Sequence, residues 1–273
     1  MKTRILVVIP LLPALIVFIL VLPPIWPAIL FGLASALAAY EMMWTTGLVK
    51  HVRLVIYSAL MAFGVSMWSY FGLHYSAALI AVLAFSGLLF MELLISKATL
   101  GFEKIGICLA SGLLIPFFLT ALVRLRCSED GRFLIVIPFL LCFLSDSGAY
   151  FTGRFLGKRK LAPKISPNKT VEGMIGGILW AVVGMMLYGL ILERYFGFTV
   201  NYLLCGMYGV LGALTGVFGD LAFSAIKRQT GIKDYGKLIP GHGGVLDRFD
   251  STSLIAPLVE VLVMLLPVAV KTL

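Results

Sequence analysis

The chain alternates between long apolar segments and short polar connections. A helix needs about 20 apolar residues to cross a hydrocarbon core of roughly 30 Å, and about nine segments reach that length. The expected helices cover residues 5–22, 25–44, 54–73, 77–95, 105–123, 133–151, 174–192, 202–225 and 252–270. This pattern predicts an all-α protein, a polytopic bundle of transmembrane helices.

The first of these segments has two interpretations. Lys2 and Arg4 precede an apolar run, as they would in a secretory signal peptide. The residues that follow are Pro23, Pro24 and Trp26, and they do not form a cleavage site of small residues. We therefore favour a retained helix.

The composition is typical of a membrane protein. Hydrophobic residues make up 60% of the 273 positions and charged residues 13%, about half the charged fraction of an ordinary soluble domain. A net charge of +9 would suggest nucleic acid as the partner of a soluble chain. Here the cations lie beside apolar spans, which fits the positive-inside rule and anionic lipid better. We expect the lipid bilayer as a partner and no nucleic acid.

The distribution of cations predicts the orientation in the membrane. With the N-terminus in the cytoplasm, most of the 22 Lys and Arg residues fall on the cytoplasmic side. The connection that carries Arg124, Arg126 and Arg132 is the exception. We expect residues 1–132 to form a lipid-facing scaffold with a lipid cavity and dimer contacts, and residues 133–273 to form the catalytic region with two cytoplasmic loops.

A polar segment, residues 224–250, lies between two strongly apolar segments. Nucleotidyl transfer needs cations, backbone N–H groups that approach the phosphates closely, and carboxylates that hold Mg²⁺. Gly241, Gly243 and Gly244 have no Cβ atom, so they allow φ > 0 and this close approach. The composition indicates a site for polyphosphate and metal, and a solvated basic loop is the simpler alternative.

The end of this segment carries two carboxylates and a guanidinium group. Asp247 and Asp250 are three positions apart, which on a helix that enters the next apolar segment would put both on one face. Arg248 lies between them, and its planar fork suits bidentate binding of phosphate.

These residues resemble the signature of the phosphatidate cytidylyltransferases, the CDP-diacylglycerol synthases. The matching positions are Ser224-x-Ile226-Lys227-Arg228, Lys233-Asp234-x-Gly236 and Pro240-x-His242-Gly243-Gly244-Val245-x-Asp247-Arg248-Phe249-Asp250. The resemblance implies a membrane enzyme that transfers CMP from CTP to phosphatidic acid, giving CDP-diacylglycerol and pyrophosphate. It also implies a homodimer.

A second polar segment follows the sixth expected helix. Asp146 lies in an otherwise apolar stretch, where a carboxylate is costly and is therefore a functional candidate. Ser166 and Lys169 precede a new helix, whose first N–H groups would bind an anion. For the cations of residues 158–160, a role as topology determinants is the alternative explanation. The pattern here resembles the same family, so the resemblance spans residues 146–250.

Asp220 is the third feature of the expected site. It lies four residues before Ser224 and seven before Lys227, so all three side chains can share one helix face. Alone, Asp220 would also fit a satisfied polar group inside the bundle. The resemblance implies that Asp220 and Asp247 hold the divalent metal, with Asp250 as a further candidate ligand. The expected ion is Mg²⁺, and a second, monovalent cation is left open.

The other candidates supply charge and hydrogen bonds to the substrates. We expect Lys227, Arg228 and Arg248 to stabilise the leaving pyrophosphate or to bind the lipid phosphate. The binding residues complete the set: Asp146, Ser166, Lys169, Ser224, Lys233, Asp234, His242, Gly243 and Gly244. His242 is expected to donate to a phosphate oxygen, because Mg²⁺ prefers oxygen ligands. Three more intramembrane acids, Glu41, Glu92 and Glu260, are expected to make hydrogen bonds within the helix packing.

Two other classes of function remain open from the residues alone. Another CTP-dependent lipid enzyme, such as a CDP-archaeol synthase or a polyprenol kinase, would use similar chemistry. A secondary transporter would also carry intramembrane acids and glycine-rich helices, but the acids here gather toward the cytoplasmic end and no inverted repeat is visible. We expect a bacterial inner-membrane protein whose active site faces the cytoplasm.

Overall fold

The computed structural model describes residues 17–72, 74–96, 100–236 and 243–271. The chain forms two compact units. The N-terminal unit comprises residues 1–132 and 229–249, and the C-terminal unit comprises residues 133–228 and 250–273. The polar stretch 229–249 thus belongs to the unit built from the first helices. The division of the chain by catalytic role stays a prediction.

Within the described residues, seven helices are long and apolar enough to cross a membrane. They span Ile25–Thr45, Val52–Phe71, Tyr75–Ile95, Phe102–Cys127, Gly131–Leu156, Val171–Phe196 and Tyr202–Gln229. Each corresponds to one of the expected segments, so the sequence prediction of a polytopic helical membrane protein is confirmed for these seven. Several extend beyond their expected ends, because polar residues at a membrane surface continue a helix without being apolar.

The first and last expected spans are not among these seven helices. The first, residues 5–22, lies largely outside the described residues, although residues 17–21 are helical. The last was expected over residues 252–270, but α13 covers only Thr252–Leu265 and strand β4 covers Ala269–Lys271. That expectation was wrong at its C-terminal end.

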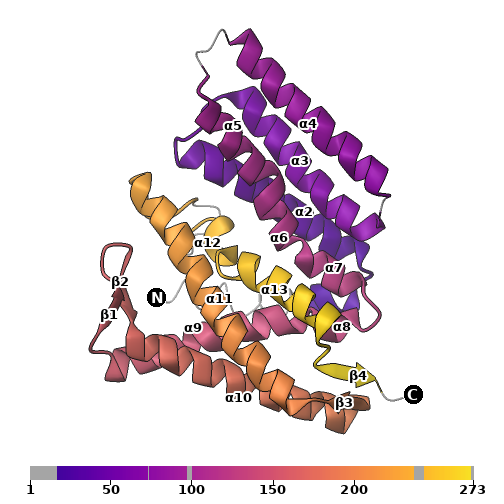
Figure 1. Ribbon diagram of the computed structural model, residues 1–273, viewed down its shortest axis with the longest axis vertical. Helices are drawn as coiled ribbons and strands as arrows, with labels where there is room; N and C mark the ends of the chain where they lie inside the picture. Colours follow the sequence, from indigo (N-terminus) through magenta and orange to yellow (C-terminus); the bar gives the residue numbers. More distant parts are fainter. Residues whose placement is uncertain (1–16, 73, 97–99, 237–242, 272–273) are drawn as a thin grey trace. The chain divides into compact units, whose positions relative to one another are not determined.

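In the N-terminal unit, the first helices along the chain lie side by side (Figure 1). Helix α2 (Ile25–Tyr40) continues into the π-helical turn η1 (Glu41–Thr45), and α3 (Val52–Phe71) and α4 (Tyr75–Ile95) follow. The fourth span consists of α5 (Phe102–Leu109), η2 (Ala110–Leu114), α6 (Ile115–Leu119) and α7 (Ala121–Cys127). Its irregular centre lies before Pro116, which cannot donate a helical hydrogen bond.

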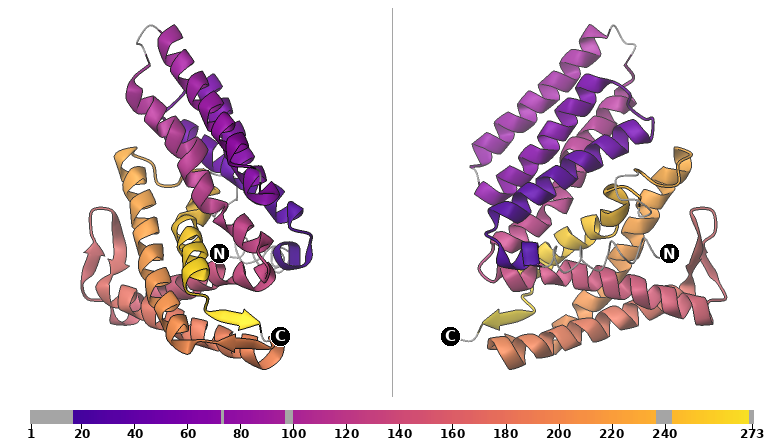
Figure 2. Two further views of the ribbon diagram at one scale, coloured as in Figure 1. Left: turned by 45° about the vertical axis from the view of Figure 1, so that its right-hand side comes forward. Right: turned by 180° about the vertical axis from the view of Figure 1, so that it is seen from behind.

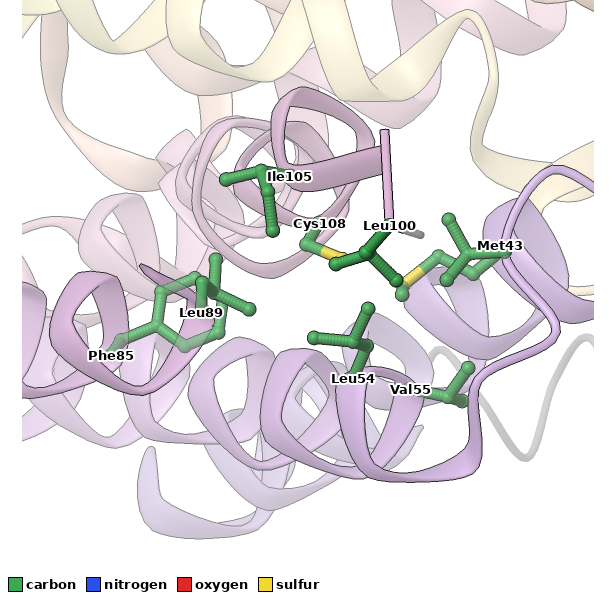
Figure 3. Close-up of a cluster of buried hydrophobic side chains, with 9 residues drawn as sticks. Met43, Leu54, Val55, Phe85, Leu89, Leu100, Ile105 and Cys108 are labelled. Carbon is green, nitrogen blue, oxygen red and sulfur yellow. The ribbon is translucent and has the colours of Figure 1, made fainter. Parts of the chain in front are cut away.

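An apolar cluster holds these helices together (Figure 3). Leu54 of α3, Leu89 of α4 and Cys108 of α5 are fully buried and meet in it. The exposed apolar residues of α4 lie outside this cluster, as expected for a helix that faces lipid. Glu92 of α4 accepts hydrogen bonds from Arg53 Nη1 at 3.4 Å and from the Tyr57 hydroxyl at 3.3 Å, so it is a packing group with a charged partner.

In the C-terminal unit, α8 (Gly131–Leu134) leads into α9 (Val136–Leu156), which packs along α10 (Val171–Phe196). Glycines allow the close approach. A Cβ atom on Gly177 would lie 2.7 Å from the Ser145 carbonyl oxygen, and one on Gly148 would lie 2.6 Å from Trp180 Cβ. In lipid the hydrophobic effect does not drive helices together, so their association depends on van der Waals packing. Small residues of this kind allow that packing because they let the backbones approach closely. Helix α11 (Tyr202–Gln229) and α13 complete the unit.

Two small antiparallel sheets, of which one is a hairpin, lie in the described part of this unit, so the protein is helical with small sheets. Strands β1 (Lys160–Ala162) and β2 (Ser166–Thr170) pair antiparallel between α9 and α10, and both views of Figure 2 show this hairpin at the end of those helices. Strand β3 (Phe198–Val200) pairs antiparallel with β4, with Thr199 opposite Val270.

Candidate functional site

The C-terminal half of α11 carries a polar face. The Ser224 hydroxyl donates to Asp220 Oδ1 at 3.4 Å, and the Lys227 side chain lies on the same helix and is buried. This confirms the predicted shared face, because the spacing of four and seven residues follows the helical period. The polar segment does not begin as a loop: α11 continues to Gln229, so Lys227 and Arg228 are helical.

Strand β2 brings a second cation to this face. The Lys169 ammonium group forms an ion pair with Asp220 Oδ2. The side chains of Lys169 and Asp220 are only 26% and 24% exposed, so solvent screens the pair less than it screens a surface ion pair. Ser166 begins the same strand. The hairpin is fixed further by Arg228, whose Nε donates to the Ile165 carbonyl oxygen at 3.1 Å.

The N-terminus of α10 has protein partners of its own. Thr170 is the N-cap residue, and its hydroxyl accepts a hydrogen bond from Gly173 N at 3.0 Å. Glu172 Oε2 accepts from Lys158 N and Arg159 N at 3.0 and 3.1 Å. The sequence predicted an anion site at this helix start. One of its amides, that of Gly173, donates to the Thr170 hydroxyl. The anion site stays a prediction.

Asp250 lies beside Asp220 within the C-terminal unit. Burial and the negative charge of Asp220 raise the pKa of Asp250 to about 7, although the Ser251 amide donates to Asp250 Oδ1 at 2.7 Å. The positive charge of Lys227 acts in the opposite direction and lowers the pKa of Asp250. Two carboxylates in a half-buried position repel each other, and a cation between them would relieve that repulsion.

The expected helix through Asp247 and Asp250 is broken. Helix α12 covers Leu246–Phe249 and α13 begins at Thr252, so Asp250 lies in the turn between them. The prediction that the two carboxylates share one helix face was wrong. The physical reason is that Asp250 and Ser251 hydrogen-bond locally, with the Ser253 hydroxyl donating to the Asp250 carbonyl oxygen at 2.9 Å.

Asp146 lies in the middle of α9, because this helix continues to Leu156, beyond the expected end at residue 151. Its carboxylate is exposed, and Cys142 Sγ approaches Oδ2 at 3.8 Å one turn earlier. Lys169 and Asp220 are its charged neighbours. The C-terminal unit therefore gathers Asp146, Asp220 and Asp250 around Lys169 and Lys227.

The N-terminal unit contains the end of the signature segment. Asp247 Oδ2 accepts hydrogen bonds from Tyr235 N at 2.7 Å and from Gly244 N at 2.9 Å. Gly243 has φ +84°, a left-handed conformation that glycine adopts without strain. The prediction of a special backbone conformation at Gly243 is confirmed. Asp247 thus holds two parts of the signature segment together, at Tyr235 and at Gly244.

Three other predicted site residues are exposed. They are Lys233, Asp234 and Arg248. His242 lies outside the described residues, as do the neighbouring positions 237–241. The binding roles of these residues stay predictions.

Glu41 is a site residue whose partners the sequence did not reveal. Its side chain is 4% exposed, and its two carboxylate oxygens accept hydrogen bonds from Val245 N at 3.0 Å and from Leu246 N at 2.8 Å. A Cβ atom on Gly244 would overlap this carboxylate. The space at Gly244, interpreted from the sequence as room for a ligand, is therefore filled by Glu41. The only sequence signal was an acid in an apolar helix.

A pocket of about 630 Å³ lies next to Glu41 in the N-terminal unit. Its wall comes from η1 and the end of α2 on one side and from residues 232–236 on the other. The lining residues are Leu37, Tyr40, Glu41, Thr45, Ile232, Lys233, Asp234, Tyr235 and Gly236. The pocket combines an apolar surface with the charged pair Lys233 and Asp234, a lining suited to an amphipathic ligand.

The comparison with known proteins decides the family. A model of the "Cytidylyltransferase family" matches residues 2–266. The chain belongs to the cytidylyltransferase family. The match includes both units and every site residue described above, and the described residues contain helices that could cross a membrane, so this family member is an integral membrane transferase.

Several curated relatives of this cytidylyltransferase family member come from staphylococci. A protein of Staphylococcus haemolyticus named phosphatidate cytidylyltransferase is 36% identical over 182 residues, which are 67% of this chain and 68% of the relative. The protein of the same name from Staphylococcus epidermidis is 38% identical over 181 residues, 66% and 67% of the two chains. That from Staphylococcus aureus is 37% identical over 185 residues, 67% and 68% of the two chains.

The shared metal site stays a prediction. Asp220 belongs to the C-terminal unit and Asp247 to the N-terminal unit. Within the described part of the chain, no three His, Cys, Asp or Glu side chains form a group that could hold a metal ion. The carboxylate oxygens that are present still suit Mg²⁺, which is commonly held by one or two carboxylates together with substrate phosphates and water.

Proposed function

We propose that this chain transfers CMP from CTP to phosphatidic acid and releases CDP-diacylglycerol and pyrophosphate. The observation that carries the proposal is the family match over residues 2–266, and the relatives named phosphatidate cytidylyltransferase indicate the lipid acceptor. A phosphate oxygen of the lipid attacks the α-phosphorus of CTP. The bond from the α-phosphorus to the bridging oxygen breaks, and pyrophosphate leaves with the electron pair.

The reaction needs no covalent bond to the protein, because the lipid phosphate is itself the nucleophile. Positioning and neutralisation of charge then supply most of the catalysis. Lys169, which forms an ion pair with Asp220, and Lys227, whose charge acts on Asp250, neutralise the phosphate oxygens. Ser224, already hydrogen-bonded to Asp220, holds that carboxylate in place.

The residues of this chain fit a magnesium ion. Asp250 is half-buried beside Asp220, and burial together with the charge of Asp220 raises its pKa to about 7. Asp220 and Asp247 would hold Mg²⁺, with Asp250 as a further candidate ligand. When bound, the ion neutralises charge on the triphosphate. A second, monovalent cation is compatible with the remaining acids.

The exposed residues of the signature segment complete the nucleotide site in this proposal. Arg248 and Arg228 bind phosphate oxygens, and Lys233, Asp234 and His242 contact the nucleotide or the lipid phosphate. Gly243 allows the backbone to approach these groups closely, and Gly244, whose amide donates to Asp247, helps to hold the segment in place. We expect Ser166 and Asp146 to contribute to substrate binding as well.

The protein is an integral membrane protein, and we place it in the bacterial inner membrane with its site facing the cytoplasm, where CTP is available. The bias of cations toward one side supports this orientation. The acyl chains of the substrate reach the site sideways from the bilayer. The family resemblance suggests a homodimer.

The test is to incubate the purified protein with labelled CTP and phosphatidic acid and to separate the lipid products by chromatography. We expect label from the α-phosphate and the base in CDP-diacylglycerol, and label from the γ-phosphate in pyrophosphate. A polyprenol kinase would instead transfer the γ-phosphate to an added polyprenol, and a CDP-archaeol synthase would prefer an ether-linked acceptor. Absence of any CDP-lipid would contradict the proposed function.

A further inference from the structure

The carboxylate of Glu41 holds the signature segment at two consecutive amides. Oε1 accepts from Val245 N at 3.0 Å and Oε2 accepts from Leu246 N at 2.8 Å. Glu41 begins η1, the π-helical turn that ends the span containing α2. Burying a carboxylate is costly unless it is well hydrogen-bonded, so this arrangement is a specific structural feature of the N-terminal unit.

The backbone around Glu41 is shaped to its carboxylate. A Cβ atom on Gly236 or on Gly244 would overlap the Glu41 side chain. Glycine at both positions is therefore explained by this one acid. The next turn of η1 adds a contact, because the Thr45 hydroxyl donates to the Tyr235 carbonyl oxygen.

The same two stretches of backbone are the ones that bind Asp247. Its Oδ2 accepts from Tyr235 N and from Gly244 N. Glu41 and Thr45 of η1 thus contact both stretches, residues 235–236 and 244–246. Asp247 links the two stretches through its hydrogen bonds to Tyr235 N and Gly244 N. The ring of Phe249 also packs edge-on against Phe31 of α2, with centroids 6.2 Å apart. The position of Asp247 depends on this arrangement.

We propose that Glu41 is a positioning residue for the transfer reaction, because it sets the backbone that holds Asp247. The inference rests on the proposed function for its kinetic consequence, but the hydrogen bonds themselves do not depend on it. Glutamine cannot replace Glu41, since its amide has one acceptor oxygen and would turn an NH₂ group toward a backbone N–H. Aspartate keeps the charge but is one methylene shorter.

The first measurement needs no substrate. Hydrogen exchange followed by mass spectrometry compares the wild-type protein with Glu41→Gln and with Glu92→Gln. We expect faster exchange at the amides of residues 244–247 in Glu41→Gln and an unchanged rate there in Glu92→Gln, another intramembrane acid whose partners are Arg53 and Tyr57. Wild-type exchange at these amides in Glu41→Gln would overturn the proposal.

The second measurement is kinetic. Displacing a catalytic group by about 1 Å costs about 100-fold in rate, so kcat should fall by about that factor in Glu41→Gln while KM for CTP changes little. Glu92→Gln should lose less than about tenfold. Gly244→Ala, which puts a methyl group where the carboxylate lies, should resemble Glu41→Gln, and the double variant should be little worse than either. Turnover near wild type in Glu41→Gln, or additive losses, would contradict the proposal.

Two controls keep the outcomes separate. If the wild-type protein forms no CDP-lipid, the proposed function fails, and the exchange data alone decide the role of Glu41. If Glu41→Gln is not recovered as a monodisperse protein, Glu41→Asp takes its place. Its shorter side chain should still accelerate exchange at residues 244–247, and wild-type exchange in that variant would overturn the proposal.

Discussion

The ammonium group of Lys169, on strand β2, forms an ion pair with the carboxylate of Asp220, on helix α11. The pair is mostly shielded from solvent, and Ser224 donates to the other oxygen of the same carboxylate. The hairpin between α9 and α10 therefore supplies a cation to a site whose acids lie on other elements. In the proposed reaction, this lysine balances Asp220 before the substrate binds and neutralises a phosphate oxygen afterwards.

Lys169→Met should lower kcat for CDP-lipid formation by about 100-fold, since removing one group that stabilises developing charge typically costs that much. The matched control is Lys164→Met, in the exposed turn of the same hairpin, which should stay within about threefold of wild type because a solvated surface charge contributes little. Equal losses in the two variants would mean that the hairpin acts through its overall charge, and not through the contact with Asp220.

Asp220→Asn and Asp247→Asn should each reduce the rate by about 1,000-fold or more with folding intact, because the substitution is nearly isosteric and removes a ligand charge. If both hold one Mg²⁺, the double variant should be little worse than either single variant. The assay is CDP-lipid formation at saturating Mg²⁺, with size-exclusion profiles in detergent as the folding control. Additive losses would show that the two aspartates do not act at one metal.

Chelation of divalent cations should abolish turnover, and added Mg²⁺ should restore it, because the cations of the site do not fully neutralise a triphosphate. CTP or dCTP should support the reaction and ATP should not. The measurement is product formation in EDTA, then with excess Mg²⁺, for each nucleotide. Full activity in chelator would disprove the metal requirement.

Single cysteines at Lys158 and Lys233 should react with a membrane-impermeant maleimide only from the cytoplasmic side. Both side chains are exposed, and the positive-inside rule places both loops there. The background must lack the native cysteines, since Cys127 is also exposed. Labelling of either position from outside intact cells would reverse the orientation and the access of CTP.

Gly209→Ala should destabilise the C-terminal unit by about 1–3 kcal/mol, the usual cost of overpacking a tight contact. A Cβ atom there would lie 2.6 Å from Val182 Cα, which is backbone and cannot rotate away. Gly206→Ala, one turn earlier on α11, is the control, because its Cβ atom would meet its nearest atom, Met186 Cε, at 3.7 Å. Thermal unfolding in detergent should separate the two variants.

The sequence determined the features that depend on local periodicity. Seven of the expected spans match seven helices, since about 20 apolar residues specify a membrane helix almost without regard to tertiary context. The shared face of Asp220, Ser224 and Lys227 follows from the same local geometry. The family also followed from the signature, whose residues stand close together in the sequence.

Tertiary structure decided the partners of those residues. The carboxylates of Asp247 and Asp250 were expected on one helix, but local hydrogen bonds around Ser251 break it and α13 begins only at Thr252. The acid of Glu41 could be recognised in the sequence as costly, but its two amide partners, Val245 and Leu246, could not. Periodicity describes neighbours along a helix, whereas a hydrogen bond between distant segments depends on how the chain packs, and only the packed N-terminal unit brings this carboxylate to those amides.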